Sequence, residues 1–221
     1  MQDRPALLLF SGGQDSMTCL FWAKKHFQCV KAVFFHYDQR HDVEYQSAVE
    51  LAEMTAVDMD DLHVPAFREI GGTAMIDKIP IENTEKNIPT TFVPGRNIVF
   101  LSLAASLAYK KGIHDIVTGV NDADYSGYPD CRESFIASMQ ESLSRGLDYS
   151  IRIHAPLQSL DKAGIWALSD ELGVMDTIIE YSHTCYLGDH HTRHSWGYGC
   201  GECPACRLRK NGFERYIAEK K

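Results

Sequence analysis

The alternation of apolar runs with helical periodicity is the feature that most constrains the fold of this chain. Residues 7–10 form a short, continuously apolar run, as in a strand buried within a parallel sheet, and helical spacing follows over residues 16–27. Later segments repeat this order, with strands predicted at 30–35, 62–65, 113–118 and 151–155, and helices at 42–56, 97–110, 131–145, 161–172 and 205–219. We therefore predict an α/β fold with a doubly wound parallel sheet.

Composition and charge exclude several classes of protein. A chain of 221 residues that is 44% hydrophobic can build its own core, so intrinsic disorder is excluded. Lys and Arg number 22 against 30 Asp and Glu, and this acidic balance argues against a protein that grips nucleic-acid backbones along its surface. The longest early apolar run, residues 6–10, is too short for an export signal or a membrane span. We expect a cytoplasmic protein.

The predicted sheet indicates where a ligand should bind. Open parallel sheets bind ligands beyond the carboxyl ends of their strands, near the point where the strand order reverses. This rule selects residues 11–16, 36–41, 94–97 and 119–133. Residues 67–94 lack periodicity, and so long a loop in a compact domain is expected to be a lid or a binding loop.

The loop after the first strand reads Ser-Gly-Gly-Gln-Asp-Ser over residues 11–16. Its two glycines allow close backbone approach, and its amides stand at a helix N-terminus, where anions bind. Asp15 suits such a loop if Mg²⁺ lies between its carboxylate and a phosphate. The simpler alternative is a glycine turn with a serine cap. Neither a Walker A loop nor a dinucleotide fingerprint is present.

This loop is similar to the PP-loop of the ATP pyrophosphatases, enzymes that cleave ATP between the α and β phosphates and adenylate a substrate oxygen. The resemblance implies ATP as cosubstrate, Mg²⁺ beside Asp15, and catalytic roles for Asp15 and Ser16. The residues it implies for nucleotide binding are Phe10, Ser11, Gly12, Gly13, Gln14, Asp15, Ser16, Met17, Thr18, Cys19 and Leu20.

Further segments narrow the resemblance. Residues 37–41, 91–97, 118–120 and 124–132, with the cysteine tail, resemble the 7-cyano-7-deazaguanine synthases of queuosine biosynthesis. The resemblance spans nearly the whole chain and implies an ATP-dependent carbon–nitrogen ligase. Such an enzyme converts 7-carboxy-7-deazaguanine and ammonia to 7-cyano-7-deazaguanine through adenylated carboxylate and amide intermediates. Two departures are Asp38, where the family usually has glycine, and a longer stretch at 186–199.

Residues near 119–133 are the expected substrate wall. Carboxylates can accept the paired N–H donors of a guanine-like ring, and aromatic rings can stack on it. The expected substrate-binding residues are Arg40, Asp124, Tyr128, Asp130 and Arg132. Arg96 and Lys162 are expected to neutralise the substrate carboxylate or the departing pyrophosphate. The alternatives are a solvated polar loop and two surface charges at helix ends. Cys131 is taken as structural, because no partner histidine is identifiable.

Four cysteines near the C-terminus predict a metal site. Their thiolates, Cys185, Cys200, Cys203 and Cys206, can form a closed tetrahedral Zn²⁺ site. The same spacing suits an iron–sulfur cluster, and the family resemblance favours zinc. Four nearby histidines are expected to be solvated or to contact the cysteine ligands without binding the metal themselves: His183, His190, His191 and His194. We predict a nucleotide-binding domain at 1–180 and a small zinc module at 181–221.

The expected reaction partners are a small-molecule substrate and ammonia. Once the sheet and the metal module are assigned, no length is left for a glutamine-using domain, so free ammonium is the expected nitrogen donor. Neither nucleic acid nor a membrane is expected as a partner, and a homodimer is left open. Two alternatives remain: a tRNA-modifying PP-loop enzyme of the thiolase or lysidine-synthetase type, and a non-enzymatic nucleotide-binding module that uses its tail to bind nucleic acid.

Overall fold

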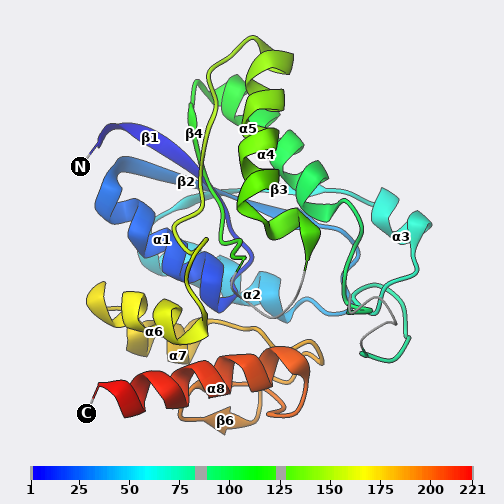
Figure 1. The fold of residues 1–221 in the computed structure, drawn as a ribbon, viewed down its shortest axis with the longest axis vertical. Coiled ribbons are helices and arrows are strands. Elements are labelled where there is room, and N and C mark those ends of the chain that lie inside the picture. Colours follow the sequence, from blue (N-terminus) through cyan, green and yellow to red (C-terminus); the bar gives the residue numbers. More distant parts are fainter. Residues whose placement is uncertain (1, 83–88, 123–127, 221) are drawn as a thin grey trace.

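The computed structural model describes residues 2–82, 89–122 and 128–220, and it shows a parallel sheet covered by helices on both faces (Figure 1). The first half contains β1 (Gln2–Leu9), α1 (Gln14–His26), β2 (Phe27–His36), α2 (Val43–Thr55), β3 (Asp58–His63), α3 (Ala66–Ile70) and α4 (Arg96–Lys111). The second half contains β4 (Asp115–Val117), the short 3₁₀ turn η1 (Pro129–Cys131), α5 (Glu133–Leu147), β5 (Arg152–His154), α6 (Lys162–Glu171), α7 (Met175–Tyr181), β6 (Arg193–His194), β7 (Gly197–Tyr198) and α8 (Pro204–Glu219).

The five-stranded sheet has the order β3-β2-β1-β4-β5, with every pair parallel. The chain runs outward from β1 to β3 and then returns to the other side of β1 with β4. The strand order therefore reverses between β1 and β4, and the predicted doubly wound fold is confirmed. A ligand site is expected where the loops after these two strands face each other.

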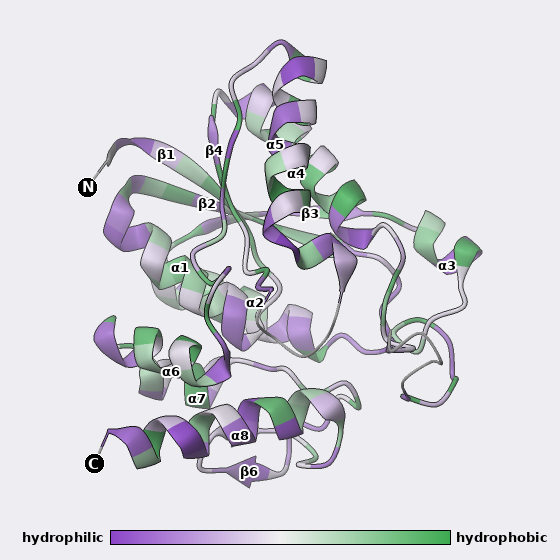
Figure 2. Cartoon of the chain, viewed as in Figure 1, coloured by the Kyte–Doolittle hydropathy of each residue, from purple (hydrophilic) through white to green (hydrophobic). Residues whose placement is uncertain are grey.

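The two faces of the sheet have separate apolar cores. On one face, α1 packs with α6, α7 and the C-terminal tail around Leu20, Trp166 and Ile178. On the other face, α4 and α5 pack around Leu101, Ile116 and Ile136. Figure 2 shows hydrophobic green on β2 and hydrophilic purple at the start of β1, whereas the helices are banded with both colours. Apolar burial on both faces explains why β1 reads as a continuous apolar run.

Several element boundaries differ from the sequence expectation. The third strand was expected at 62–65, but β3 covers Asp58–His63 and is rich in aspartate because it lies at the edge of the sheet. The second strand was expected at 30–35, but β2 covers Phe27–His36 and includes Cys29, whose side chain is exposed. The short elements α3, α7, β6 and β7 were not predicted, because each is too brief to show a period.

The tail beyond α7 packs directly on the rest of the fold. Helix α8 lies beside α6 (Figure 1), where the Trp166 and Phe213 rings meet edge to face at 5.2 Å. Gly212 is required there, because a Cβ atom would lie 2.4 Å from the Cβ atom of Lys162. The division into two domains at 180/181 stays a prediction. Cys206 of the tail belongs to the same apolar cluster as residues of α1. No helix of the described residues is long and apolar enough to cross a membrane.

Candidate active site

A cavity of about 300 Å³ opens at the carboxyl ends of β1 and β4. Its lining comes from both chain halves and from the tail, and includes residues from the loops after β1, β2 and β4, the start of α4 and the start of α6. The rule for parallel sheets placed a ligand site here from the sequence.

One half of the cavity is the phosphate loop, residues 11–16. Gly12 has a φ angle of 77°, and a Cβ atom there would lie 2.4 Å from the carbonyl oxygen of Glu44. Glycine is therefore needed for both conformation and space. The hydroxyl oxygens of Ser11 and Ser16 lie 3.1 Å apart, and Ser16 also donates to the carbonyl of Gly13. These bonds shape a loop whose backbone N–H groups begin helix α1, a position that favours anions.

Asp15 and Lys162 form an ion pair within the cavity wall. The Lys162 ammonium donates to both carboxylate oxygens of Asp15 at 2.7 Å. The Lys162 side chain is 7% exposed and that of Asp15 is 28% exposed, so the lysine is held inside the fold while the carboxylate faces the cavity. This excludes the alternative in which Lys162 is a surface charge at a helix end.

The other half of the cavity is an aromatic wall, which we define as Tyr37, Phe100, Tyr128 and Tyr186. Tyr37 is buried and meets the Phe100 ring edge to face at 5.6 Å. The Tyr128 hydroxyl lies 2.6 Å from the Thr91 hydroxyl. Flat apolar surfaces with hydroxyl groups at their edges suit a planar heterocycle.

Arg96 joins the two halves. It is the first residue of α4, and its guanidinium carbon lies 5.9 Å from the centre of the Tyr37 ring. Burial alone would lower the pKa of Arg96, but the nearby Tyr37, Tyr128 and Asp130 raise it by more than burial lowers it. The net pKa is above its usual value, so the guanidinium stays charged. Asp130 fixes the start of this helix, because its carboxylate accepts the Asn97 backbone N–H at 3.1 Å.

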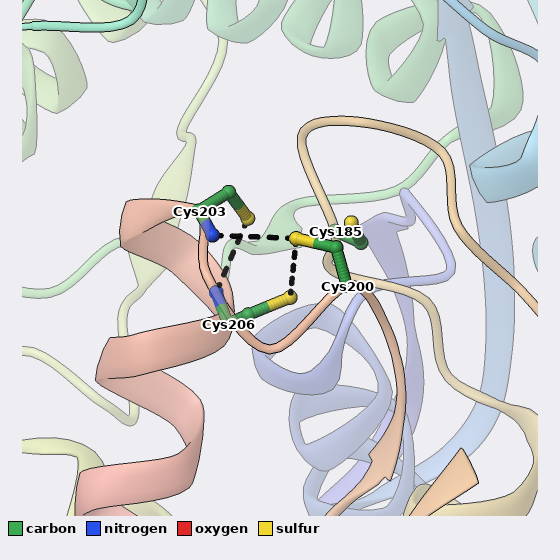
Figure 3. A group of neighbouring side chains, drawn as sticks. All are labelled: Cys185, Cys200, Cys203 and Cys206. Atoms are coloured by element: carbon green, nitrogen blue, oxygen red, sulfur yellow. Dashed lines mark hydrogen bonds between the residues drawn. The ribbon is translucent and has the colours of Figure 1, made fainter. Parts of the chain in front are cut away.

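The four tail cysteines converge on one point (Figure 3). Their sulfur atoms all lie within 4.8 Å of one another, and those of Cys200 and Cys206 are 3.9 Å apart. A tetrahedral Zn²⁺ with bonds of about 2.3 Å would separate its sulfur ligands by about 3.8 Å. The cluster fits a single metal ion. A four-iron cluster would hold its thiolates farther apart, since each would bind a different iron.

The four-cysteine cluster is connected to the cavity through the residues that flank Cys185. Thr184 and Tyr186 stand on either side of Cys185, and both line the cavity. The backbone N–H of His183 donates to the carbonyl of Gly12 at 3.0 Å. The tail therefore forms part of the cavity wall and braces the phosphate loop.

Arg209 of α8 holds this connection in place. Its guanidinium is fully buried and donates to the carbonyls of Trp196, Ser182 and Ile178 and to the Thr184 hydroxyl. Burial lowers the pKa of Arg209 to about 10, so it remains charged at neutral pH. One side chain thus connects α7, the loop after it and the turn between β6 and β7 to helix α8.

Comparison with known proteins identifies the family. The family model described as queuosine biosynthesis protein QueC matches residues 5–217.

The chain belongs to the QueC family.

Proteins named 7-cyano-7-deazaguanine synthase are similar along their whole length. The one from Nitrobacter hamburgensis is 50% identical, covering 97% of this chain and 96% of its own. The one from Bordetella pertussis is 48% identical, covering 97% and 93%.

Two solved structures share the fold at low identity. A 4-thiouridine synthetase–RNA complex with bound ATP has a TM-score of 0.52 at 16% identity, covering 98% of this chain and 50% of that one. A predicted tRNA methyltransferase subunit from Methanocaldococcus jannaschii has a TM-score of 0.50 at 19% identity, covering 76% and 75%. At such identities the likeness concerns the fold alone.

In this QueC family member, the cavity contains part of the residue set predicted for nucleotide and substrate. Phe10, Ser11, Asp15 and Ser16 line it, together with Tyr128, Arg96 and Lys162. The rest of the predicted nucleotide set supports the loop: Gly12 and Gly13 shape it, Gln14 begins α1, and Met17, Thr18, Cys19 and Leu20 are buried behind it.

Other predicted substrate residues of this QueC family member lie elsewhere. Arg40 and Arg132 are exposed and outside the cavity lining, and Asp130 is buried in its bond to Asn97. Asp124 lies outside the described residues. Of the tail histidines, His183 is buried, and burial lowers its pKa to about 4.

Sequence reasoning missed Glu44, Thr184 and Tyr186 as cavity residues. Glu44 lies within the first turn of α2, a position that reads as an ordinary polar helix start. The sequence could have pointed to Glu44 only through its position shortly after the carboxyl end of the second strand, where ligands of parallel sheets bind. Thr184 and Tyr186 could have been suspected from their position beside Cys185.

Proposed function

We propose that this chain is an ATP-dependent synthase that converts 7-carboxy-7-deazaguanine and ammonia to 7-cyano-7-deazaguanine. The observation that carries the proposal is the single cavity in which a PP-loop faces an aromatic wall, in a chain that is half identical to proteins named for this product. The family match favours this activity over a tRNA-modifying PP-loop enzyme.

The phosphate loop supplies the activation chemistry. A carboxylate is a poor electrophile, because its leaving group would be hydroxide or oxide. When the substrate carboxylate attacks the α phosphorus of ATP, pyrophosphate leaves and a mixed anhydride forms, whose leaving group is AMP. The loop amides and Lys162 stand where they can stabilise the phosphate charge, and Arg96 can hold the substrate carboxylate. Mg²⁺ would be held by Asp15 and would neutralise the charge of the phosphates.

One cavity serves both activations in turn. Ammonia attack on the anhydride gives an amide and releases AMP. Activation of the amide oxygen by a second ATP, followed by elimination, gives the nitrile. The described residues contain one phosphate loop, so the amide has to be activated where it was made.

The four-cysteine site is proposed to hold structural Zn²⁺. Four thiolates leave no coordination position for water, so the ion would stabilise the fold rather than activate a substrate. Its binding would fix Thr184 and Tyr186 in the cavity wall.

Product analysis tests the proposed activity. Purified protein is incubated with 7-carboxy-7-deazaguanine, ATP and ammonium, and products are quantified by chromatography and mass spectrometry. We expect two AMP and two pyrophosphate per nitrile made from the acid, and one of each per nitrile made from the amide without ammonia. An amide that accumulates and is never consumed would show an enzyme that stops after the first activation. Nitrile formation with glutamine as the sole nitrogen source would contradict free ammonia as the donor.

A further inference from the structure

Glu44 is an acidic side chain of the cavity that the activation chemistry leaves unused. It lies in the first turn of α2, and its own backbone carbonyl packs against Gly12 of the phosphate loop. Its side chain lines the cavity. It therefore stands between the loop that would bind ATP and the aromatic wall that would bind the substrate.

The groups that face Glu44 come from several elements. Arg96 at the start of α4 is the nearby cation, while Tyr37 follows β2 and Tyr186 belongs to the tail. Tyr128 lies beside the same tyrosines, and Asp130 and Cys131 face Arg96 from η1. Glu44 is thus placed next to the residue that we expect to hold the substrate carboxylate.

Few groups in the described part of the cavity can accept a proton at neutral pH. Its described lining contains two carboxylates, Asp15 and Glu44, and no histidine. Asp15 accepts two hydrogen bonds from Lys162. Burial raises the pKa of Cys131 to about 12, and burial also raises the pKa values of Tyr37 and Tyr186, so these groups stay protonated.

The surroundings of Glu44 suit proton transfer. Burial raises its pKa to about 7, although the positive charge of Arg96 opposes the shift. A base is most effective when its pKa lies near the working pH, because it is then both available and strong enough to take the proton. A carboxylate here also attracts ammonium into a cavity that already contains cations.

We propose that Glu44 is the general base that removes a proton from the nitrogen as ammonia attacks the adenylated carboxyl carbon. The nitrogen lone pair forms the new C–N bond, the bond between that carbon and the AMP oxygen breaks, and AMP leaves with the electron pair. The nitrogen then carries one proton too many, and the Glu44 carboxylate takes it and later releases it to water. This inference rests on the proposed synthase activity.

The conversion of the amide to the nitrile also requires a base that removes protons from the nitrogen. The amide nitrogen carries two protons and the nitrile nitrogen carries none. After the amide oxygen has attacked the second ATP, both protons leave the nitrogen as the C–O bond to AMP breaks. A base located beside the substrate carbon can accept them in turn, so one carboxylate serves both nitrogen-dependent steps.

The test separates adenylation from the chemistry of nitrogen. Adenylation of the acid requires no base for nitrogen, and it is followed by acid-dependent exchange of labelled pyrophosphate into ATP in the absence of ammonium. For Glu44→Gln we expect exchange within about twofold of the unmodified protein, and amide formation slower by about 10²–10⁴-fold, the usual contribution of a general base. Glu50→Gln, an exposed position on the same helix, is the matched control and should change neither rate.

The pH dependence supplies a second readout. In the unmodified protein, amide formation should fall as the pH drops through about 7, because Glu44 becomes protonated there. Both proteins are assayed at a constant concentration of free ammonia, because the protonation of ammonia would otherwise lower every rate as the pH falls. Under this condition Glu44→Gln should lack the limb. Glu44→Asp keeps a carboxylate and should retain the limb at a lower rate.

Other outcomes would overturn the proposal. Equal losses of exchange and amide formation in both Glu44 variants would show that Glu44 binds the ring or supports the fold. Unchanged amide formation in Glu44→Gln would show that another group accepts the proton. If the unmodified protein shows no acid-dependent exchange, the synthase activity itself is wrong, and this result is distinct from a failure of Glu44.

Discussion

The two halves of the cavity are built in different ways. The phosphate loop is one unbroken stretch, residues 11–16, whose shape comes from bonds between near neighbours such as Ser11 and Ser16. The aromatic wall is assembled from four separate parts of the chain, and its last member, Tyr186, comes from the tail that contains the four cysteines. If the loop binds ATP and the wall binds the substrate, as proposed, then ATP binding is a local property of this chain, whereas substrate binding depends on the whole fold and on the tail.

The largest expected effect comes from a substitution that changes only the phosphate-loop half of the cavity. Asp15→Asn keeps the shape of the side chain but removes its charge. We expect acid-dependent pyrophosphate exchange to fall on the order of 10³-fold, because the charge that would hold Mg²⁺ and that pairs with Lys162 is lost. Asp176→Asn, an exposed position on α7, is the control. Near-normal exchange in folded Asp15→Asn protein would show that the loop is only a turn.

Metal removal tests whether the aromatic wall depends on the tail. Cys203→Ser, or treatment with a strong chelator, should lower the melting temperature sharply and abolish nitrile formation, since structural zinc can contribute about 10–16 kcal/mol of binding free energy to a folded module. Metal analysis should give about one zinc per chain and no iron. Cys29→Ser, on the exposed side of β2, should leave both properties unchanged. A brown, iron-containing protein would contradict the zinc assignment.

Arg209 tests the same connection without touching a metal ligand. Lysine cannot donate to all four acceptors that the guanidinium reaches, so Arg209→Lys leaves buried carbonyls without donors. We expect the free energy of unfolding to fall by about 3 kcal/mol in urea denaturation. Arg207→Lys, at an exposed position on α8, should stay within about 0.5 kcal/mol. Equal effects of the two variants would show that the buried guanidinium does not hold the tail.

The smallest expected effect tests whether the aromatic wall binds the acid substrate rather than ATP. Tyr186→Phe removes one hydroxyl from the aromatic wall, next to Tyr128. We expect the KM for the acid to rise about 5–10-fold, equivalent to about 1 kcal/mol, with the KM for ATP unchanged. Tyr109→Phe, at a position 55% exposed on α4, serves as the control. A rise in the KM for ATP alone would place the nucleotide, rather than the substrate, against this wall.

The sequence indicated the fold, and it also indicated which loop after β1 lines the cavity, whereas the role of that loop in binding phosphate stays a prediction. A buried parallel strand has to be apolar throughout, so residues 7–10 were recognisable, and a phosphate loop has to keep its glycines and hydroxyls in fixed order. The C-x₂-C spacing of the tail likewise indicated a candidate metal site, and the structure brings its four sulfur atoms within 4.8 Å of one another.

What the sequence could not show is which distant side chains meet. Asp130 and Glu44 are both acids near predicted strand ends, yet Asp130 caps α4 while Glu44 lines the cavity. Their roles depend on which way a short turn and a helix face, and the periodicity of neither segment determines this. Arg40 is exposed for the same reason: its loop turns the side chain away from the site.

The close approach of α8 to Lys162 has a consequence for the order in which the enzyme becomes competent. Gly212 lets the backbone of α8 rest against the residue that pairs with Asp15, and α8 is synthesised after every other helix. A growing chain on the ribosome folds its N-terminal parts first, so the phosphate loop can take shape early. The packing of α8 against Lys162 is completed only when this helix has emerged and docked. We therefore expect a nascent chain that still lacks α8 to consume ATP more slowly than the complete fold.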